Sequence, residues 1–242
     1  MPRFFVDALE QDARFAVLTG ESAAHAKVLR LKAGDRVTLC DSAGTDYPCV
    51  ISHMAPDQVA LVVEEPQPAA SEARVFASVY MAWAKGDKLE HVIQKATELG
   101  AAEIVTFPSA RCVARLDGKT LEKKLPRWQK IARAAAEQSG RGRIPEVLAL
   151  GSYGEALERA ARADRAIFFY ENERSRTLTA ALAGDFGTVS LLTGPEGGFA
   201  PEEVLQAEKA GLTVCTLGRR ILRCETAPLC ALSAVMFAAG EY

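Results

Sequence analysis

The sequence has no apolar run long enough to cross a membrane. Its longest apolar stretch, residues 227–239, falls short of the roughly 20 residues that a membrane helix needs, and Pro228 interrupts it. The start of the chain reaches Asp7 and Glu10 at once, so it lacks the long apolar core of a signal peptide. These absences predict a cytoplasmic protein that does not bind a membrane.

Pairs of metal-binding or catalytic side chains are also missing. None of the six cysteines forms a C-x-x-C pair or a Cys/His cluster with metal-ligand spacing, which predicts reduced thiols and no bound metal. His25, His53 and His91 are scattered, and a lone histidine is more often structural than catalytic. The sequence shows no Ser/His/Asp set, no G-x-G-x-x-G in the first strand–helix turn and no P-loop.

Positive charge is concentrated in one segment, although the net charge of the chain is −2. Residues 111–143 contain ten Lys or Arg and three acidic residues, a net charge of +7. A basic stripe of this kind suits phosphate groups whatever the total charge is. The alternative is a solvated helix face with i,i+4 ion pairs, but the shortage of acidic partners favours nucleic-acid binding.

The chain divides at residues 64–73, where prolines, small residues and charges occur together as they do in linkers. Before this point, short β-rich runs at 37–40, 49–52 and 59–63 are separated by turn residues, and 21–29 predicts a short helix. This pattern predicts a small β-barrel.

After the linker, strands and helices alternate, which predicts a mostly parallel sheet with helices on both faces. We expect strands at 75–83, 104–107, 166–170, 189–193 and 213–217. We expect helices after Asp87, around Trp128, after Ser152, from Pro201 and from Thr226. Asp87 with Glu90 and Ser152 with Glu155 have the spacing of capping boxes. Pro126 is expected either to open or to kink the second helix.

Two loops depart from plain strand–helix connections. The first is Leu192-Thr-Gly-Pro-Glu-Gly-Gly-Phe-Ala-Pro201, whose three glycines let the backbone approach a ligand closely. Its N–H groups lie where a helix begins and can face an anion or a ring acceptor, and ligands of open α/β sheets bind at the carboxyl ends of strands. The alternative is a tight structural turn.

The second loop is Leu217-Gly-Arg-Arg-Ile-Leu-Arg-Cys-Glu-Thr-Ala-Pro228, which also follows a strand and precedes a helix. It holds three arginines and a glutamate around Ile221 and Leu222. We expect this apolar pair to be covered, and the charges beside it to be partly desolvated and oriented. The alternative is a salt-bridged loop in which Glu225 holds Arg223.

Together these loops resemble the RsmE family, the 16S ribosomal RNA (uracil-N3)-methyltransferases of the SPOUT superfamily. Three further motifs agree in order and spacing, namely His25-Ala-Lys-Val-Leu-Arg30, Lys95-Ala-Thr-Glu-Leu-Gly100 and Glu137-Gln-Ser-Gly-Arg141. The likeness extends over nearly the whole chain. Arg219 stands where the family often has proline and Cys224 where it often has threonine, and both departures concern the geometry of the second loop.

The resemblance implies a PUA-like β-barrel that binds RNA over residues 1–68 and a knotted methyltransferase domain over 72–242. In such a trefoil knot the last helix passes through a loop made by the preceding segments, a rare arrangement that periodicity alone does not predict. The resemblance also implies S-adenosylmethionine (SAM) as cofactor and a homodimer. The expected substrate is 16S ribosomal RNA, either free or in the assembled small subunit.

For the chemistry, we hypothesise that Arg223 favours the deprotonated form of uracil N3, and that Glu225 accepts the N3 proton or orients Arg223. We expect the cofactor to contact Leu192, Thr193, Gly194, Glu196, Gly197, Gly198, Leu217, Gly218, Ile221, Leu222 and Arg223. We expect RNA phosphates to contact His25, Arg30, Lys85, Arg111, Arg133, Arg141 and Arg143.

Two other functions are compatible with parts of the pattern. One is a nucleotide-dependent oxidoreductase, although both loops lie late in the chain and the early glycine fingerprint is missing. The other is an RNA-binding module without catalytic activity that assists ribosome assembly, which would leave the glycine-rich loop without a purpose. SAM or NADH binding separates these alternatives from a methyltransferase.

Overall fold

The computed structural model describes residues 1–7, 9–10 and 12–242, and the chain folds into two compact units. Unit 1 comprises residues 1–72 and 136–144, and unit 2 comprises 73–135 and 145–242. The proline-rich segment at 64–73 contains the point where unit 1 gives way to unit 2. Residues 136–144 return to unit 1, a feature that the sequence pattern did not suggest.

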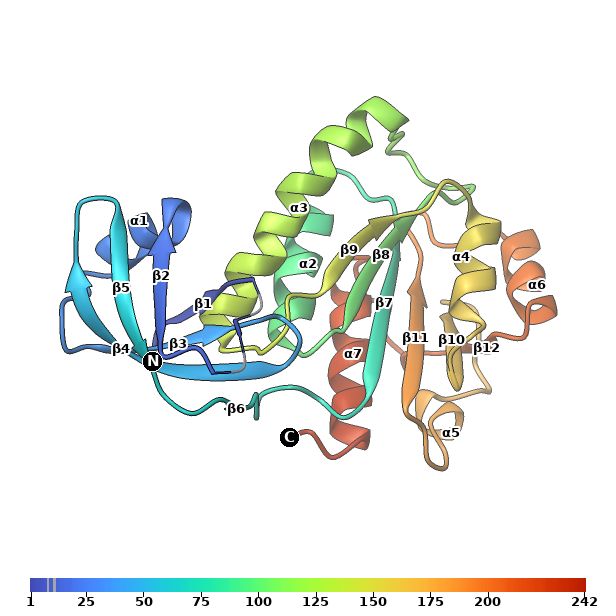
Figure 1. The fold of residues 1–242 in the computed structure, drawn as a ribbon. Coiled ribbons are helices and arrows are strands. Elements are labelled where there is room, and N and C mark those ends of the chain that lie inside the picture. Colours follow the sequence, from blue (N-terminus) through green and yellow to red (C-terminus); the bar gives the residue numbers. More distant parts are fainter. Residues whose placement is uncertain (8, 11) are drawn as a thin grey trace. The chain divides into compact units, whose positions relative to one another are not determined.

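Unit 1 is a curled sheet with one helix beside it (Figure 1). Its elements are β1 (Arg3–Phe5), β2 (Phe15–Thr19), α1 (Gly20–Val28), β3 (Arg36–Cys40), β4 (Thr45–Met54), β5 (Gln58–Val63) and β6 (Gln67–Pro68). The strands follow the order β1-β3-β4-β5-β2, with β6 on β4. The expected strands within β3, β4 and β5 and the helix within α1 are confirmed, whereas β1 and β2 were not predicted.

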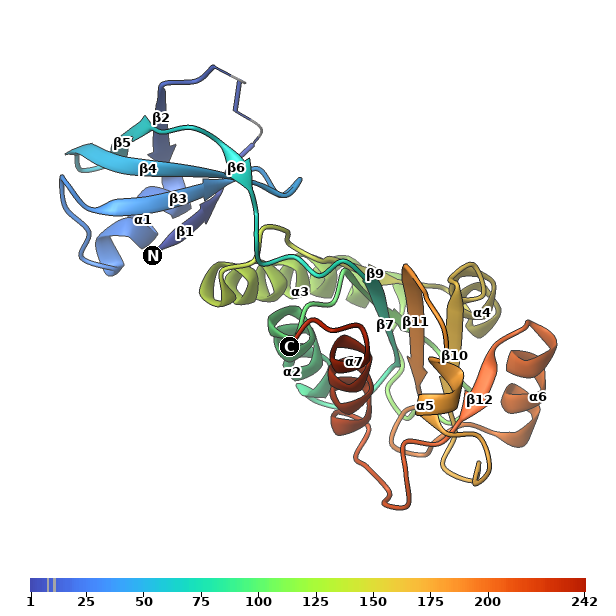
Figure 2. The ribbon, with the colours of Figure 1, turned by 90° about the horizontal axis from the view of Figure 1, so that it is seen from below.

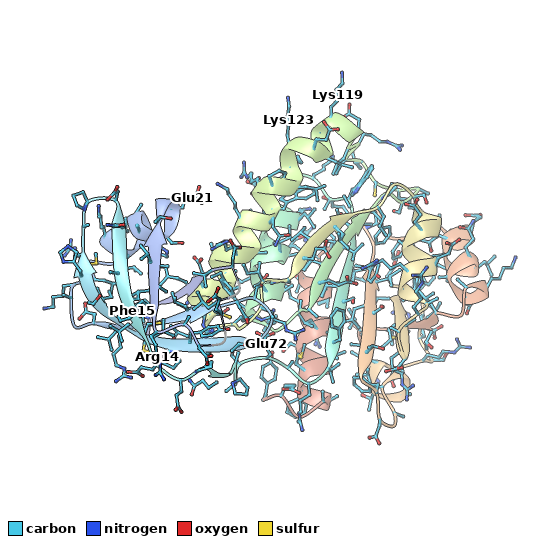
Figure 3. The ribbon with its side chains drawn as sticks, viewed as in Figure 1. Arg14, Phe15, Glu21, Glu72, Lys119 and Lys123 are labelled. Atoms are coloured by element: carbon cyan, nitrogen blue, oxygen red, sulfur yellow. The ribbon has the colours of Figure 1, made fainter. Side chains whose placement is uncertain are left out.

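Glu72 links the two segments of unit 1, residues 1–72 and 136–144. Its carboxylate accepts hydrogen bonds from Arg141 Nη2 at 2.6 Å and from the backbone N–H of Gly142 at 2.8 Å. Cys40 Sγ donates to the carbonyl of Gly142 at 2.9 Å. Residues 141–142 are therefore held to unit 1 by a charge-assisted pair and by backbone contacts. Glu72 is labelled in Figure 3.

Unit 2 is an α/β fold around a parallel sheet, as expected from the alternation of elements. Its elements are β7 (Phe76–Ala82), α2 (Lys88–Glu98), β8 (Glu103–Phe107), α3 (Gly118–Ser139), β9 (Glu146–Ala149), α4 (Tyr153–Ala160), β10 (Arg165–Phe169), α5 (Leu178–Ala181), β11 (Thr188–Thr193), α6 (Pro201–Lys209), β12 (Thr213–Cys215) and α7 (Thr226–Ala238). The strand order is β12-β10-β11-β7-β8-β9, and every adjacent pair is parallel. The last four residues of α3 belong to unit 1.

Helices cover both faces of this sheet, which explains why its strands are apolar on both sides. In Figure 2, α2 and α7 lie side by side on one face, and α4 and α6 lie on the other. On the α4 side, Tyr80, Phe107, Phe168 and Leu192 form one buried cluster with residues of α4 and α6. Among the described residues, no helix combines the length and the apolar character needed to cross a membrane.

The helix ends agree with the sequence in one case and differ in another. Ser152 and Glu155 make both bonds of a capping box at α4, as predicted. Asp87 makes no side-chain cap bond within the described chain, so its predicted capping box at α2 is wrong. Glu90, the intended partner, instead accepts a hydrogen bond from Arg127 of α3 at 2.7 Å. Pro126 lies inside α3 and does not open it.

Candidate active site

The two loops singled out in the sequence meet at the carboxyl edge of the parallel sheet of unit 2. Strand β10 lies between β11 and β12, so the loops that follow β11 and β12 leave on either side of it. This is the kind of edge at which open α/β sheets bind ligands. The loops enclose a pocket of about 520 Å³, within the range of small-molecule sites. Both Gly197 and Leu222 line this pocket.

The first loop, residues 193–200, is hereafter the glycine loop. It is anchored by Phe199, whose buried ring lies 4.3 Å from the ring of Phe168 between centroids. A Cβ added at Gly194 would lie 3.2 Å from the Phe199 ring. Gly198 has φ +65°, and a Cβ there would lie 2.3 Å from Glu171 Oε1. Gly194 is therefore favoured by close packing against a ring and Gly198 by its positive φ, and both expose backbone to the pocket.

Two contacts support the glycine loop from outside the pocket. The buried carboxylate of Glu203 accepts hydrogen bonds from the N–H groups of Ala200 and Ala110, both at 2.8 Å. Arg111 Nη1 donates to the carbonyl of Gly197 at 3.1 Å. The segment at 110–111, where the basic stripe begins, thus packs directly against the glycine loop.

The second loop, residues 216–225, is hereafter the arginine loop, and it contributes side chains to the pocket. Its first turn is held by Thr216, whose hydroxyl accepts from the N–H of Gly218 at 3.1 Å. Arg220, Leu222 and Arg223 line the pocket. Ile221 also lines it but is 72% exposed, so the prediction that the apolar pair is covered is wrong for Ile221.

Lys88, at the start of α2, connects the two loops. Its Nζ lies 2.9 Å from Glu196 Oε1 of the glycine loop and 3.9 Å from Glu225 Oε2 of the arginine loop. The same oxygen of Glu196 accepts the backbone N–H of Lys85 at 2.9 Å. Glu225 Oε2 also accepts a hydrogen bond from Cys224 Sγ at 3.2 Å. The ion-pair partner of Glu225 among the described residues is thus Lys88, not Arg223 as one interpretation of the loop supposed.

These contacts set the protonation of the site. Hydrogen bonds from its own backbone N–H and from Cys224, helped by the nearby Lys88 and Arg223, lower the pKa of Glu225. Burial alone would raise the pKa of Glu196, but the hydrogen bonds from Lys88 and Lys85 lower it. Burial and the bond to Glu225 raise the pKa of Cys224 to about 12. At neutral pH the carboxylates of Glu196, which lines the pocket, and Glu225 are therefore ionised, and the thiol of Cys224 is neutral. Glu225 itself lies outside the described lining, next to the lining residue Cys224.

Most residues predicted to bind a cofactor line this one pocket. They are Thr193, Gly194, Glu196, Gly197, Gly198, Leu217, Gly218, Ile221, Leu222 and Arg223. Leu192 lies outside the described lining, because its side chain belongs to the buried cluster under the sheet. The combination fits SAM, since exposed backbone can bond a ring and apolar Leu222 can pack on it, while carboxylates suit a cationic ligand.

The residues predicted to bind RNA are divided between the units. Unit 2 holds Lys85, Arg111 and Arg133, and unit 1 holds His25, Arg30, Arg141 and Arg143. Most of them are exposed or half-buried. Arg141 is only 4% exposed and is paired with Glu72, so its guanidinium holds unit 1 together and does not face RNA. We therefore correct its assignment.

Sequence reasoning missed the pocket residues that lie outside the two loops, among them Lys88, Tyr170 and Glu171. Tyr170 and Glu171 follow β10, the strand between the two loops, so their position depends on a strand order that the sequence did not give. Lys88 could have been noticed, since it begins the helix that follows a central strand, but the expected capping box drew attention to Asp87 and Glu90 instead.

Comparisons with known proteins agree with this geometry. Residues 71–236 match the family model of an RNA methyltransferase domain, and residues 18–64 match that of an RNA methyltransferase PUA domain. The ribosomal RNA small subunit methyltransferase E of Bacillus subtilis (strain 168) is 36% identical over 98% of this chain and 96% of its own. The protein of the same name from Mycobacterium bovis is 33% identical over 96% and 90%.

Solved structures extend the likeness to the fold. The crystal structure of a ribosomal RNA small subunit methyltransferase E from Neisseria gonorrhoeae bound to S-adenosyl methionine has a TM-score of 0.88 at 31% identity, covering 98% of both chains. A methyltransferase from Legionella pneumophila in complex with SAM has a TM-score of 0.86 at 29% identity, covering 98% and 97%. The chain therefore belongs to the family of ribosomal RNA small subunit methyltransferases E.

Proposed function

We propose that this protein transfers the methyl group of SAM to N3 of a uracil in 16S ribosomal RNA. The observation that carries the proposal is the shared pocket of the glycine and arginine loops, in a chain of the ribosomal RNA small subunit methyltransferase E family. Two relatives of the same fold hold SAM in their solved structures. An oxidoreductase or a non-catalytic RNA-binding module does not account for this combination.

When bound, SAM supplies a methyl group on a positive sulfonium. The glycine loop would hold it through backbone groups of Thr193 to Gly198, and Leu217 to Leu222 would enclose its ring. Because displacement at the methyl group is direct, the protein contributes alignment and electrostatics. The carboxylates of Glu171 and Glu196 at the pocket would attract the sulfonium, although the cations Lys88, Arg220 and Arg223 in the same lining offset their charge.

The uracil nitrogen must lose its proton before it can attack. The imide charge spreads onto the two ring oxygens, and Arg223 at the pocket would stabilise it there. Glu225 is ionised at neutral pH, so its carboxylate has a free oxygen for the N3 proton, directly or through a water, although its lowered pKa makes it a weaker base. Alternatively, Glu225 orients Arg223. We propose both residues as the catalytic pair.

We also propose that the basic residues guide the RNA to this pocket. In unit 2, Lys119, Lys123, Arg127 and Lys130 recur every three or four residues along α3, which places them on one helix face. Lys119 and Lys123 project from the first turns of the helix (Figure 3). In unit 1, His25, Arg30 and Arg143 would contact phosphates, with the PUA domain and the methyltransferase domain dividing at about residues 68–72.

A homodimer in the cytoplasm, without a bound metal, completes the proposal. We propose that Phe237 of α7, which is 74% exposed, lies at the dimer interface. Sedimentation equilibrium would measure the mass of the particle directly.

The function is tested by methylating small ribosomal subunits that lack the modification, in parallel with free 16S RNA, using labelled SAM. We expect label in the RNA and a single modified uracil whose N3 carries the methyl group, identified by mass spectrometry of the digested RNA. Label on another base, or on another atom of uracil, would overturn the assignment of N3. No transfer to either substrate would overturn the proposed reaction.

The RNA surface is tested separately by Lys119→Ala with Lys123→Ala. Each lost phosphate contact should make the dependence of log affinity on log salt less steep by about 0.9, so the double variant should lose about 2 from this slope. Arg162→Ala with Lys209→Ala, two exposed cations at the ends of α4 and α6, is the control and should leave the slope unchanged. Equal slopes for both doubles would exclude the α3 tip from the RNA surface.

A further inference from the structure

The most unusual arrangement in the pocket is one cation shared between the two loops. Lys88 Nζ lies 2.9 Å from a carboxylate oxygen of Glu196 and 3.9 Å from one of Glu225. Glu196 belongs to the glycine loop and Glu225 to the arginine loop, and Lys88 belongs to neither. The three side chains are between 25% and 33% exposed, so the cluster is only partly screened by solvent.

We propose that Lys88 is a positioning residue for methyl transfer, which joins the two loops through Glu196 and Glu225 and fixes the Glu225 carboxylate beside Cys224 at the edge of the pocket. This inference rests on the proposed function, because it acts through the residue to which we assign the N3 proton. The backbone of Lys88 is held in place because it is the first residue of α2, the helix that follows β7. The glycine loop is fixed to the same segment by the bond from Lys85 N–H to Glu196.

The arginine loop needs the support of Lys88 because much of it is exposed. Arg220, Ile221 and Arg223 are exposed, so packing alone holds this part of the loop weakly. An ammonium that attracts both carboxylates draws the end of the arginine loop toward the glycine loop. Because a group misplaced by about 1 Å can reduce a rate on the order of 100-fold, this support bears directly on catalysis.

Lys88 also influences the proton affinity of Glu225. The charged and titratable groups that face Glu225 are Lys88 from α2, Arg223 and Cys224 from its own loop, and Glu196, which shares the same ammonium. Removing Lys88 takes away a positive charge and leaves Glu196 unpaired nearby. Both changes raise the pKa of Glu225, so the carboxylate becomes protonated at a higher pH than in the wild type.

The test is Lys88→Met, with Lys88→Arg as the rescue and Lys95→Met as the matched control. Lys95 lies on the same helix, has a similar exposure and forms its ion pair with Glu98 at 2.8 Å. Single-turnover methylation is measured against pH, and SAM affinity is measured by calorimetry. We expect Lys88→Met to lower the rate on the order of 10- to 100-fold and to move the acid limb of the profile to higher pH. Lys88→Arg should restore both, and Lys95→Met should change neither.

A double variant shows whether Lys88 acts through Glu225. In Glu225→Gln the acid limb of the pH–rate profile should disappear. Adding Lys88→Met to Glu225→Gln should then lower the rate much less than Lys88→Met lowers it in the wild-type protein. Three results would overturn the proposal. The acid limb of the pH–rate profile does not move in Lys88→Met, Lys88→Arg does not restore the rate, or weaker SAM binding explains the whole loss of rate in Lys88→Met. A wild-type protein that methylates no RNA would instead refute the proposed function.

Discussion

The glycine loop and the arginine loop build one pocket in opposite ways. The glycine loop is anchored by buried Phe199 and Glu203, and its glycines present backbone to the pocket. The arginine loop is short of such anchors, and its exposed Arg220, Ile221 and Arg223 present side chains. We infer that the glycine loop holds the cofactor through its backbone, whereas the arginine loop encloses the cofactor ring and also supplies the side chains that act on the RNA base.

The largest effect that this division predicts concerns Arg223. Arg223→Ala should lower the single-turnover rate on the order of 100- to 1,000-fold, because it removes the cation proposed to stabilise the uracil imide charge. SAM affinity, measured by calorimetry, should change only slightly, since we propose that backbone groups and Leu222 contribute most of the cofactor contacts. A near-normal rate, or a loss of SAM affinity alone, would show that Arg223 of the arginine loop does not act on the RNA base.

The converse effect is predicted for the glycine loop. In Gly198→Ala the new methyl group would lie 2.3 Å from Glu171 Oε1, at a φ of +65° that costs about 1–2 kcal/mol for a residue with a side chain. SAM affinity should fall about tenfold, because the backbone is strained and the new methyl group displaces the Glu171 carboxylate, which lines the pocket. Calorimetry of SAM binding measures the loss.

Gly211→Ala is the matched control for this variant. Gly211 also has a positive φ, +91°, but no atom lies within 4 Å of a Cβ added there, and it lies outside the described lining of the pocket. It should lower the thermal midpoint without changing SAM affinity. Equal SAM affinities for the two variants would mean that the glycine loop does not hold the cofactor.

The smallest effect is expected at Cys224, whose thiol donates a hydrogen bond to Glu225. Cys224→Thr keeps a donor and should leave the methylation rate nearly unchanged. Cys224→Val has a similar shape without the donor, and it should lower the rate about three- to tenfold, in line with the loss of one hydrogen bond. Single-turnover rates at one pH are sufficient for this comparison, and equal rates would show that the bond does not matter.

The fold was predictable where one local pattern decided the structure. The strands of unit 2 are apolar and rich in β-branched residues, and Ser152 with Glu155 specifies a helix start by itself. Short edge strands were missed, since β1 has only three residues and β2 exposes Phe15 and Val17. The threading of α7 through a knot, which the resemblance implies, stays a prediction.

The site was predictable loop by loop but not as a whole. Glycines that follow a strand and arginines beside an apolar pair indicate chemistry locally, and both loops do line the pocket. Lys88, Glu171 and the pairing of Glu225 depend on which strand ends are neighbours, and strand order is a property of the whole sheet. Arg141 was assigned to RNA binding, although it is buried and paired with Glu72, because nothing near it in the sequence reveals that partner.

A crystal structure of this protein with SAM tests the account most directly. We predict density for the cofactor between the two loops, with its ring against backbone of residues 217–222 and the remainder facing residues 193–198. The methyl group should point toward Arg223 and Glu225. SAM bound outside the pocket, or bound there with its methyl group directed away from both residues, would contradict the account.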